Sequence, residues 1–105
     1  MKKLVVLFLL IYAGQKSSAQ LSWLQLPDFP GGNRFAVASF SLNGKGYIGL
    51  GVDSLVQGYS DLYEYDASNN QWTQKASLPG VGRWACGVFT IGDKAYIACG
   101  AITGG

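Results

Sequence analysis

The chain repeats itself at an interval of 49 residues, and this repeat constrains the fold more than any other feature of the sequence. The two copies align at residues they share, such as Trp23 with Trp72 and Arg34 with Arg83. Eleven identities fall in the 34 comparable positions from Trp23 to Val56, without a gap, whereas chance would give roughly two or three. The copies therefore represent one structural unit, and the fold has to be built by stacking that unit.

Each unit reads as a series of short β-strands. Asn43-Gly44 is a strong hairpin-turn signal between two apolar runs, and the segment DLYEYD alternates as a third strand before a polar turn. We expect strands at residues 34–42, 45–51, 61–66 and 71–75. The chain after residue 20 shows no helical period, so the expected fold class is all-β. Four antiparallel strands in a meander are typical of one blade of a β-propeller, whose blades recur every 40 to 50 residues or so.

The residues of both copies resemble the kelch repeats. In that family an arginine opens the first strand, an aromatic precedes a glycine-rich end of the second, the third is acidic and aromatic, and the fourth contains a tryptophan. The matching residues are Arg34, the apolar run Ala36 to Phe40, Asn43-Gly44, Tyr47 to Gly51, Asp61 to Asp66 and Trp72, then Arg83, Phe89, Gly92-Asp93, Tyr96 and Gly100. The chain departs from the family where paired glycines usually end the second strand, which here read Gly49-Leu50-Gly51 and Ala98-Cys99-Gly100. The resemblance covers residues 20–105 and implies kelch-type propeller blades of four antiparallel strands.

The strands amount to about one and three-quarter blades: an outer strand at 21–26, a blade at 34–75 and half a blade at 83–100. A closed propeller takes at least four blades, and a repeat buries its faces only against neighbouring repeats. We therefore expect further C-terminal blades, which makes this sequence an N-terminal part of a longer protein. The alternative is a ring that assembles from several copies of the chain.

Residues 1–19 have the pattern of a signal peptide. Lys2-Lys3 is followed by a ten-residue apolar run at 4–13, and the small residues Ser17 and Ala19 stand at positions −3 and −1 before Gln20. The apolar run is shorter than the roughly 20 residues that a membrane span needs. We expect cleavage before Gln20, no membrane attachment afterwards, and a secreted or periplasmic location, where disulfides can form.

Charge and histidine content exclude several functional classes. Removal of Lys2, Lys3 and Lys16 leaves five basic against six acidic residues, so the formal charge of +2 becomes −1 and nucleic acid is not an expected partner. The chain contains no histidine, so it has no Ser-His-Asp or Cys-His arrangement. We expect no cofactor, no metal and no catalytic residue among the residues present.

A glycine motif invites a nucleotide-binding interpretation that the pattern does not support. Residues 44–49 match G-x-G-x-x-G, but that fingerprint needs a helix to begin at the loop, and here a strand is expected. The second copy has Asp93, Ala95 and Ala98 at the three glycine positions. We assign the glycines to a turn and to tight packing.

Cys86 and Cys99 are the only cysteines. If Gly92-Asp93 forms a two-residue turn, they lie opposite one another at a non-hydrogen-bonded pair, with Cα atoms about 4.5 Å apart. That spacing is near the short end of disulfide geometry. The first copy has Val37 and Leu50 at this place, so a disulfide and a buried apolar pair both remain open.

Ligand-binding residues are expected on the face that carries the loops between blades and between second and third strands. Polar groups there stand beside aromatic rings, a combination that suits sugar or peptide recognition. The candidates are Asn33, Arg34, Phe35, Asp53, Tyr59, Arg83 and Trp84. Arg34 and Arg83 have a structural alternative, the bridging of blades, and Trp23 and Trp72 are expected to pack between blades. By alternation Asp61 faces away from Glu64 and Asp66, and Asp66 is expected to serve its turn.

These features favour an exported, non-catalytic module that recognises a protein or a glycan. The alternative is an enzyme scaffold, since the chain also looks like the kelch-like ring of galactose oxidase and of a sialic-acid mutarotase, with site residues beyond those present. A third hypothesis is a structural surface protein that carries the ring as a spacer.

Overall fold

The computed structural model describes residues 21–104, so the expected signal peptide lies outside the described residues. Within this range the chain is all-β, as expected, and no helix in it could cross a membrane. The strands are β1 (Ala38–Leu42), β2 (Lys45–Gly49), β3 (Leu62–Asp66), β4 (Gln71–Lys75), β5 (Arg83–Trp84), β6 (Gly87–Ile91), β7 (Lys94–Ala98) and β8 (Ala101–Ile102).

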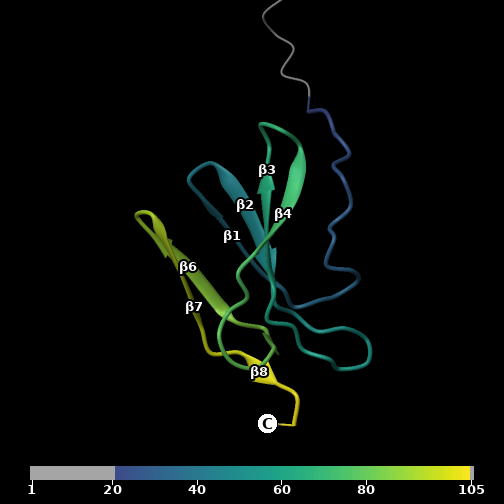
Figure 1. Ribbon diagram of the computed structural model, residues 1–105, viewed down its shortest axis with the longest axis vertical. Helices are drawn as coiled ribbons and strands as arrows, with labels where there is room; N and C mark the ends of the chain where they lie inside the picture. Colours follow the sequence, from purple (N-terminus) through teal and green to yellow (C-terminus); the bar gives the residue numbers. More distant parts are fainter. Residues whose placement is uncertain (1–20, 105) are drawn as a thin grey trace, which may run out of the picture.

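The first four strands form one antiparallel sheet in the order β1-β2-β3-β4 (Figure 1). The β1–β2 hairpin closes at the pair Leu42↔Lys45, with Asn43 (φ 51°) and Gly44 (φ 75°) both left-handed. Two left-handed residues are what a type I′ turn needs, and its twist matches that of the strands it joins. The G-x-G-x-x-G motif therefore lies in a hairpin and continues into β2, not into a helix.

The second copy repeats the first hairpin at the same interval of 49 residues. Strands β6 and β7 pair from Gly87↔Ala98 to Ile91↔Lys94, which confirms the two-residue turn at Gly92-Asp93. The short β5–β8 pairing, Trp84↔Ala101, repeats the bridge Phe35↔Val52 of the first copy. The rings of Phe89 and Tyr96 are stacked at 5.2 Å, as those of Phe40 and Tyr47 are at 4.9 Å. The internal repeat of the sequence is thus a repeat of backbone geometry and of side-chain packing.

The apolar run at residues 34–42 is not one strand. Ala36 is left-handed (φ 54°), and its counterpart Ala85 is as well (φ 56°), so the backbone turns before β1 and before β6. Only Phe35 pairs ahead of that turn, through its bridge to Val52. The expected outer strand at 21–26 does not form in this structure either. A strand needs a neighbouring edge to accept its hydrogen bonds, and Trp23 in this segment is fully exposed.

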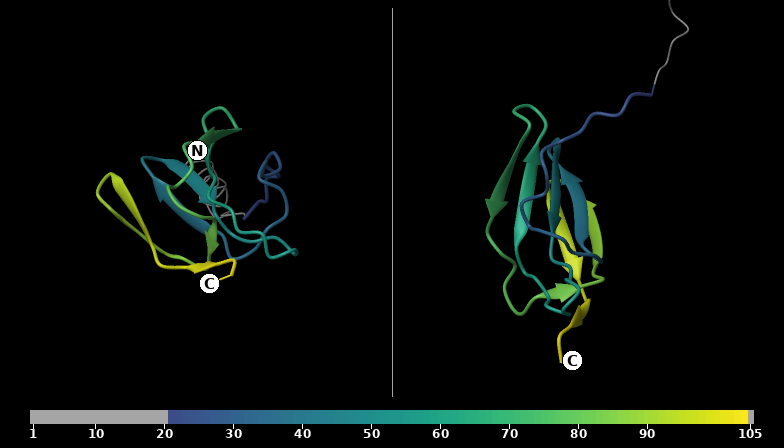
Figure 2. Two further views of the ribbon diagram at one scale, coloured as in Figure 1. Left: turned by 60° about the horizontal axis from the view of Figure 1, so that its bottom comes forward. Right: turned by 90° about the vertical axis from the view of Figure 1, so that its right-hand side faces the viewer.

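The two copies are joined by backbone hydrogen bonds at one end of the strands, opposite the hairpin turns (Figure 2). The Arg83 N–H donates to the Tyr59 carbonyl at 3.1 Å, and the Gly51 N–H donates to the Arg83 carbonyl at 3.0 Å. A third bond, from the Ala85 N–H to the Ala36 carbonyl, lies alongside. The loops that carry the candidate site residues gather at this end, which we call the loop end.

The second hairpin packs against one face of the first sheet, mainly against β1 (Figure 1). An open cavity of about 360 Å³ remains between them. It is lined by Phe40, Leu42, Tyr47, Leu62, Leu78, Ala95 and Ile97. On the opposite face of the sheet, Phe29 contacts Tyr63 and Trp72 edge to face, and the Trp72 indole N–H donates to the Pro27 carbonyl at 3.0 Å. The sheet thus has a neighbouring segment on each face: the second hairpin with the open cavity on one, and the segment with Phe29 on the other.

We expect Gly82→Ala to destabilise the protein by about 3 kcal/mol, because the junction leaves no room for a side chain. A Cβ on Gly82 would overlap the Gly58 carbonyl and would lie 2.7 Å from the Tyr59 nitrogen. Urea unfolding followed by tryptophan fluorescence measures the change. Gly46→Ala is the matched control, since a Cβ there meets nothing within 4 Å; equal midpoints for the two variants would contradict this account of the junction.

Candidate functional site

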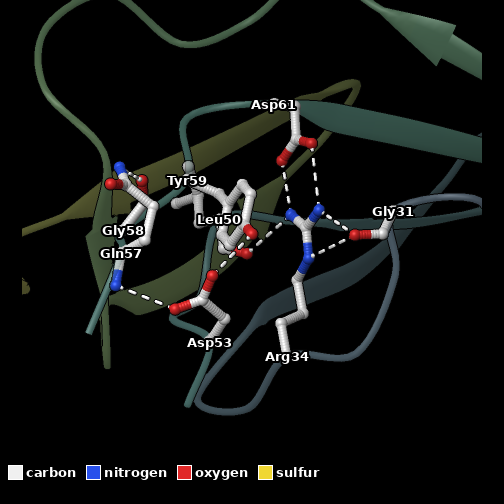
Figure 3. A network of polar contacts seen from close by, with 8 residues as sticks. All are labelled: Gly31, Arg34, Leu50, Asp53, Gln57, Gly58, Tyr59 and Asp61. Carbon is white, nitrogen blue, oxygen red and sulfur yellow. Dashed lines mark hydrogen bonds and ion pairs between the residues drawn. The ribbon is translucent and has the colours of Figure 1, made fainter. Parts of the chain in front are cut away.

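Three of the expected ligand-binding residues, Arg34, Asp53 and Tyr59, lie together in one polar network at the loop end (Figure 3). Arg34 directly precedes the bridged residue Phe35. Asp53 and Tyr59 lie within the loop between β2 and β3, one near its start and one near its end. The sequence analysis placed their loops on one face and predicted no contact among the three side chains. The hydrogen bonds of each side chain show whether it is free to bind a ligand.

The Arg34 guanidinium makes five hydrogen bonds. Nη1 donates to the Leu50 carbonyl at 3.1 Å and to Asp61 Oδ1 at 2.5 Å, and Nη2 donates to Asp61 Oδ2 at 3.1 Å. Nε and Nη2 both donate to the Gly31 carbonyl. The guanidinium also lies 3.9 Å from the centre of the Tyr59 ring, and the side chain is only 3% exposed. Because a guanidinium has five N–H donors, none is left over for a ligand, and Arg34 holds the loops together.

Asp53 organises the loop between β2 and β3. Its Oδ1 accepts the Leu55 and Gln57 N–H groups, each at 2.9 Å, and its Oδ2 accepts the Tyr59 hydroxyl at 2.9 Å. The Gln57 N–H bond, followed by the Tyr59 hydroxyl bond, holds the pKa of Asp53 below its ordinary value. The same hydroxyl bond raises the pKa of Tyr59. Asp53 is thus a loop-ordering residue, because all three contacts are made within its own loop.

The second copy contributes Arg83 and Trp84 to the loop end. Arg83 Nη1 donates to the Cys99 carbonyl at 3.3 Å, which repeats the contact of Arg34 with the Leu50 carbonyl. Trp84 is half-buried, and a Cβ on Gly58 would lie 3.1 Å from its ring. Of the other candidates, Asn33 is exposed and Phe35 is 61% exposed.

The two cysteines are free thiols in the structure. The Cys86 thiol donates to the Cys99 carbonyl at 3.7 Å, and burial raises the pKa of Cys86. The β6–β7 ladder stops one pair short of them, at Gly87↔Ala98, because Cys99 is left-handed (φ 65°). Cys99 is exposed here, so the two do not form a buried apolar pair; disulfide formation stays a prediction.

A second charged cluster surrounds Glu64 on the sheet, and the sequence analysis missed it. Glu64 is buried (8% exposed) and accepts the Tyr47 hydroxyl at 2.6 Å, with Lys45 Nζ at 3.3 Å and Lys75 Nζ at 3.6 Å. The Tyr47 bond, followed by the lysines, lowers the pKa of Glu64, while the pKa of Tyr47 rises. The pairing Tyr47↔Glu64 would have revealed this cluster, but it requires the β2–β3 register.

The remaining acidic residues follow the expected pattern. Asp61 pairs with Arg34, away from the face on which Glu64 and Asp66 meet Lys45. Asp66 Oδ1 accepts the Ser68 N–H and hydroxyl at 2.9 and 2.6 Å, so it caps its turn. Among residues 21–104 no group of three or more side chains could hold a metal ion.

Apolar side chains are the exposed part of the loop end. Leu55 is 85% exposed and Val56 is 54% exposed, at the tip of the loop that Asp53 orders. Phe35 lies on the segment before β1, and its bridge partner Val52, at the start of this loop, is itself bridged to Gly58. We call the exposed and half-buried residues at this end the loop-end surface: Asn33, Phe35, Leu55, Val56 and Trp84.

Comparisons of the chain with protein-family models, with curated proteins and with solved structures found no match.

We expect Arg34→Lys or Asp61→Asn to destabilise the protein by about 3 kcal/mol, because each leaves a largely buried partner without its counterpart. Asp61 is 19% exposed in this pair, and a lysine cannot make the paired bonds of a guanidinium. Chemical denaturation measures the loss. Lys75→Gln is the control: Lys75 is 44% exposed, and its partner Glu64 keeps Tyr47 and Lys45, so the loss should be less than about 1 kcal/mol. Losses below that level in Arg34→Lys would refute the structural role.

The order of the loop around Asp53 should depend on pH. Folding lowers the pKa of this carboxyl, so its contribution to stability is complete above its ordinary pKa of about 3.9 and is lost as the pH falls through the lower folded value. We expect the Leu55 and Gln57 amide resonances to shift together in that acidic range in an NMR titration. Asp53→Asn should abolish this inflection, and its persistence in the variant would assign it to another carboxyl.

Proposed function

We propose that the chain forms kelch-type blades of a β-propeller and that the protein is an exported, non-catalytic module that binds a protein ligand at the loop-end surface. A repeated unit that stacks face to face supports the blade interpretation. The second hairpin lies on the first sheet, and each unit keeps the same stacked Phe–Tyr pair and the same arginine-to-carbonyl bond.

Backbone conformation at the end of the second strand of each unit also supports the kelch resemblance. Leu50 and Gly51 have φ angles of 56° and 95°, and Cys99 and Gly100 have 65° and 95°. Two successive left-handed residues favour glycine at both positions, and this is where the kelch pattern has its paired glycines. The chain keeps the second glycine of each pair and strains the first residue.

The exposure of apolar side chains at the loop end is the observation that carries the functional proposal. The polar candidates Arg34 and Asp53 are used within the network. In contrast, Phe35 is exposed before β1, and Leu55 and Val56 are exposed on the loop that Asp53 orders. Ordered, exposed aromatic and aliphatic groups are typical of binding surfaces, because their burial against a partner releases water without a large ordering cost. On the loop-end surface the two aliphatic residues and Phe35 are strongly exposed, whereas Trp84 is half-buried. This composition favours a protein ligand over a glycan, which would need more exposed ring faces.

A selection experiment tests the proposal. We expect a displayed peptide library to yield ligands whose affinity falls at least about tenfold in Phe35→Ala and in Leu55→Ala, as for exposed anchors in an interface. Ile91→Ala is the control, since Ile91 is as exposed (63%) but precedes the hairpin turn at the opposite end. Ligands that bind all three variants equally, or binding confined to a glycan array, would overturn the proposal of a protein ligand.

A further inference from the structure

Cys86 and Cys99 lie between two pairings of the second copy. Each is the next residue beyond Gly87↔Ala98, the last pair of the β6–β7 hairpin, and the β5–β8 pairing follows on the same two segments in the same register. Opposed residues of antiparallel strands have Cα atoms about 4.5 to 5.5 Å apart, which falls within the range of disulfides. Paired positions on both sides therefore hold the two cysteine backbones at a spacing that a disulfide can bridge.

The Cys86 side chain is directed at the segment that contains Cys99. Its thiol donates to the Cys99 carbonyl at 3.7 Å, and a Cβ on Gly100 would lie 2.5 Å from Cys86 Sγ. Val37 takes the same place in the first copy, since its Cγ1 lies 2.9 Å from the position of a Cβ on Gly51. The repeat thus sets this orientation, and the second copy has a sulfur where the first has a methyl group.

The segments on both sides of the cysteines lead to the loop-end surface. Trp84, a residue of that surface, pairs with Ala101 two positions away from the cysteines. Further along, the Thr103 hydroxyl donates to the carbonyl of Val56, another surface residue, at 2.8 Å. Val56 is left-handed (φ 62°), which is unfavourable for a β-branched residue, so its position depends on contacts of this kind. A covalent bond between the cysteines would restrain both surface residues.

We propose that Cys86 and Cys99 form an intramolecular disulfide that clamps the loop end, so that the loop-end surface is more rigid in the oxidised protein than in the reduced one. The bond forms by exchange with a small disulfide such as oxidised glutathione. The thiolate of one cysteine attacks a glutathione sulfur and releases one glutathione thiolate, and the second cysteine then displaces the other. The two cysteines lose two protons and two electrons, and one glutathione disulfide becomes two thiols.

The proposal rests on the proposed export for its oxidant, because disulfides form and persist in oxidising compartments. It needs no ligand at the loop end. Its test therefore supplies the oxidant in vitro and leaves the ligand out, so that failure of the clamp and failure of the proposed binding function give separate results.

An equilibrium with glutathione tests the pairing in the full chain. The protein is equilibrated with mixtures of reduced and oxidised glutathione, in water and in concentrated urea, and the intramolecular disulfide is measured by intact mass after an acid quench. We expect the equilibrium constant for closing the bond to be at least about tenfold higher in water, because a disulfide that fits the folded backbone stabilises it by linkage. A ratio near or below one would overturn the proposal, and so would a glutathione adduct or a disulfide-linked dimer as the final product.

Amide hydrogen exchange tests the clamp. We expect the Trp84 and Ala101 amides to exchange at least about tenfold more slowly in the oxidised protein than in the reduced protein, while the amides of β3 remain unchanged. Cys86→Ser, treated with the same oxidant, is the control and should show no added protection. Equal exchange of Trp84 and Ala101 in the two redox states would show that the bond does not clamp the loop end.

A second variant tests whether the clamp reaches the loop between β2 and β3. Oxidation should shift the Gln57 amide resonance, since the Gln57 N–H shares a peptide group with the Val56 carbonyl that Thr103 holds. Thr103→Val removes this hydrogen bond with little change in shape. It should abolish the Gln57 shift and leave the protection of Ala101 in place. A Gln57 shift that persists in Thr103→Val would exclude Thr103 as the connection between the disulfide and this loop.

Discussion

The ion pair between Arg34 and Asp61 is the interaction on which the loop end depends. It joins the segment before β1 to the segment before β3, and through the Leu50 carbonyl it also fixes the end of β2. Tyr59 covers the guanidinium and bonds to Asp53, so the loop that carries Leu55 and Val56 is ordered by the same arginine. A buried ion pair is of use where geometry matters more than net stability. Here that geometry is the meeting point of three chain segments.

The junction between the two copies builds directly on this arrangement. The backbone of Arg83 bonds to Gly51 and to Tyr59, two residues that the Arg34 network has already positioned. Close approach is possible only because Gly58 and Gly82 have no side chains. The buried apolar residues Leu50 and Val52 lie next to these contacts. Backbone hydrogen bonds at the start of the second unit thus hold it to the first unit, and its β6–β7 hairpin packs onto the sheet.

Much of this fold was predictable because the signals are local. The Asn43-Gly44 turn, the hairpin register set by Gly92-Asp93 and the capped turn at Asp66 all follow from turn chemistry, alternation and the repeat. The left-handed residues Ala36 and Ala85 were not predicted, since alanine gives no sign of that conformation. The Glu64 cluster was missed because it depends on the register between β2 and β3. A 12-residue loop joins these strands, and turn rules fix the register only for short hairpin turns.

The repeat also explains why identical residues need not have identical roles. Arg34 and Arg83 have the same backbone setting and the same bond to a carbonyl, yet Arg34 is saturated by Asp61 and stacked on Tyr59. Within the described residues Arg83 has neither partner. A guanidinium with all its donors bound inside the protein stabilises the fold. The loop before β3 supplies Asp61 and Tyr59 to Arg34, and a sequence comparison of the two copies alone would not reveal these contacts.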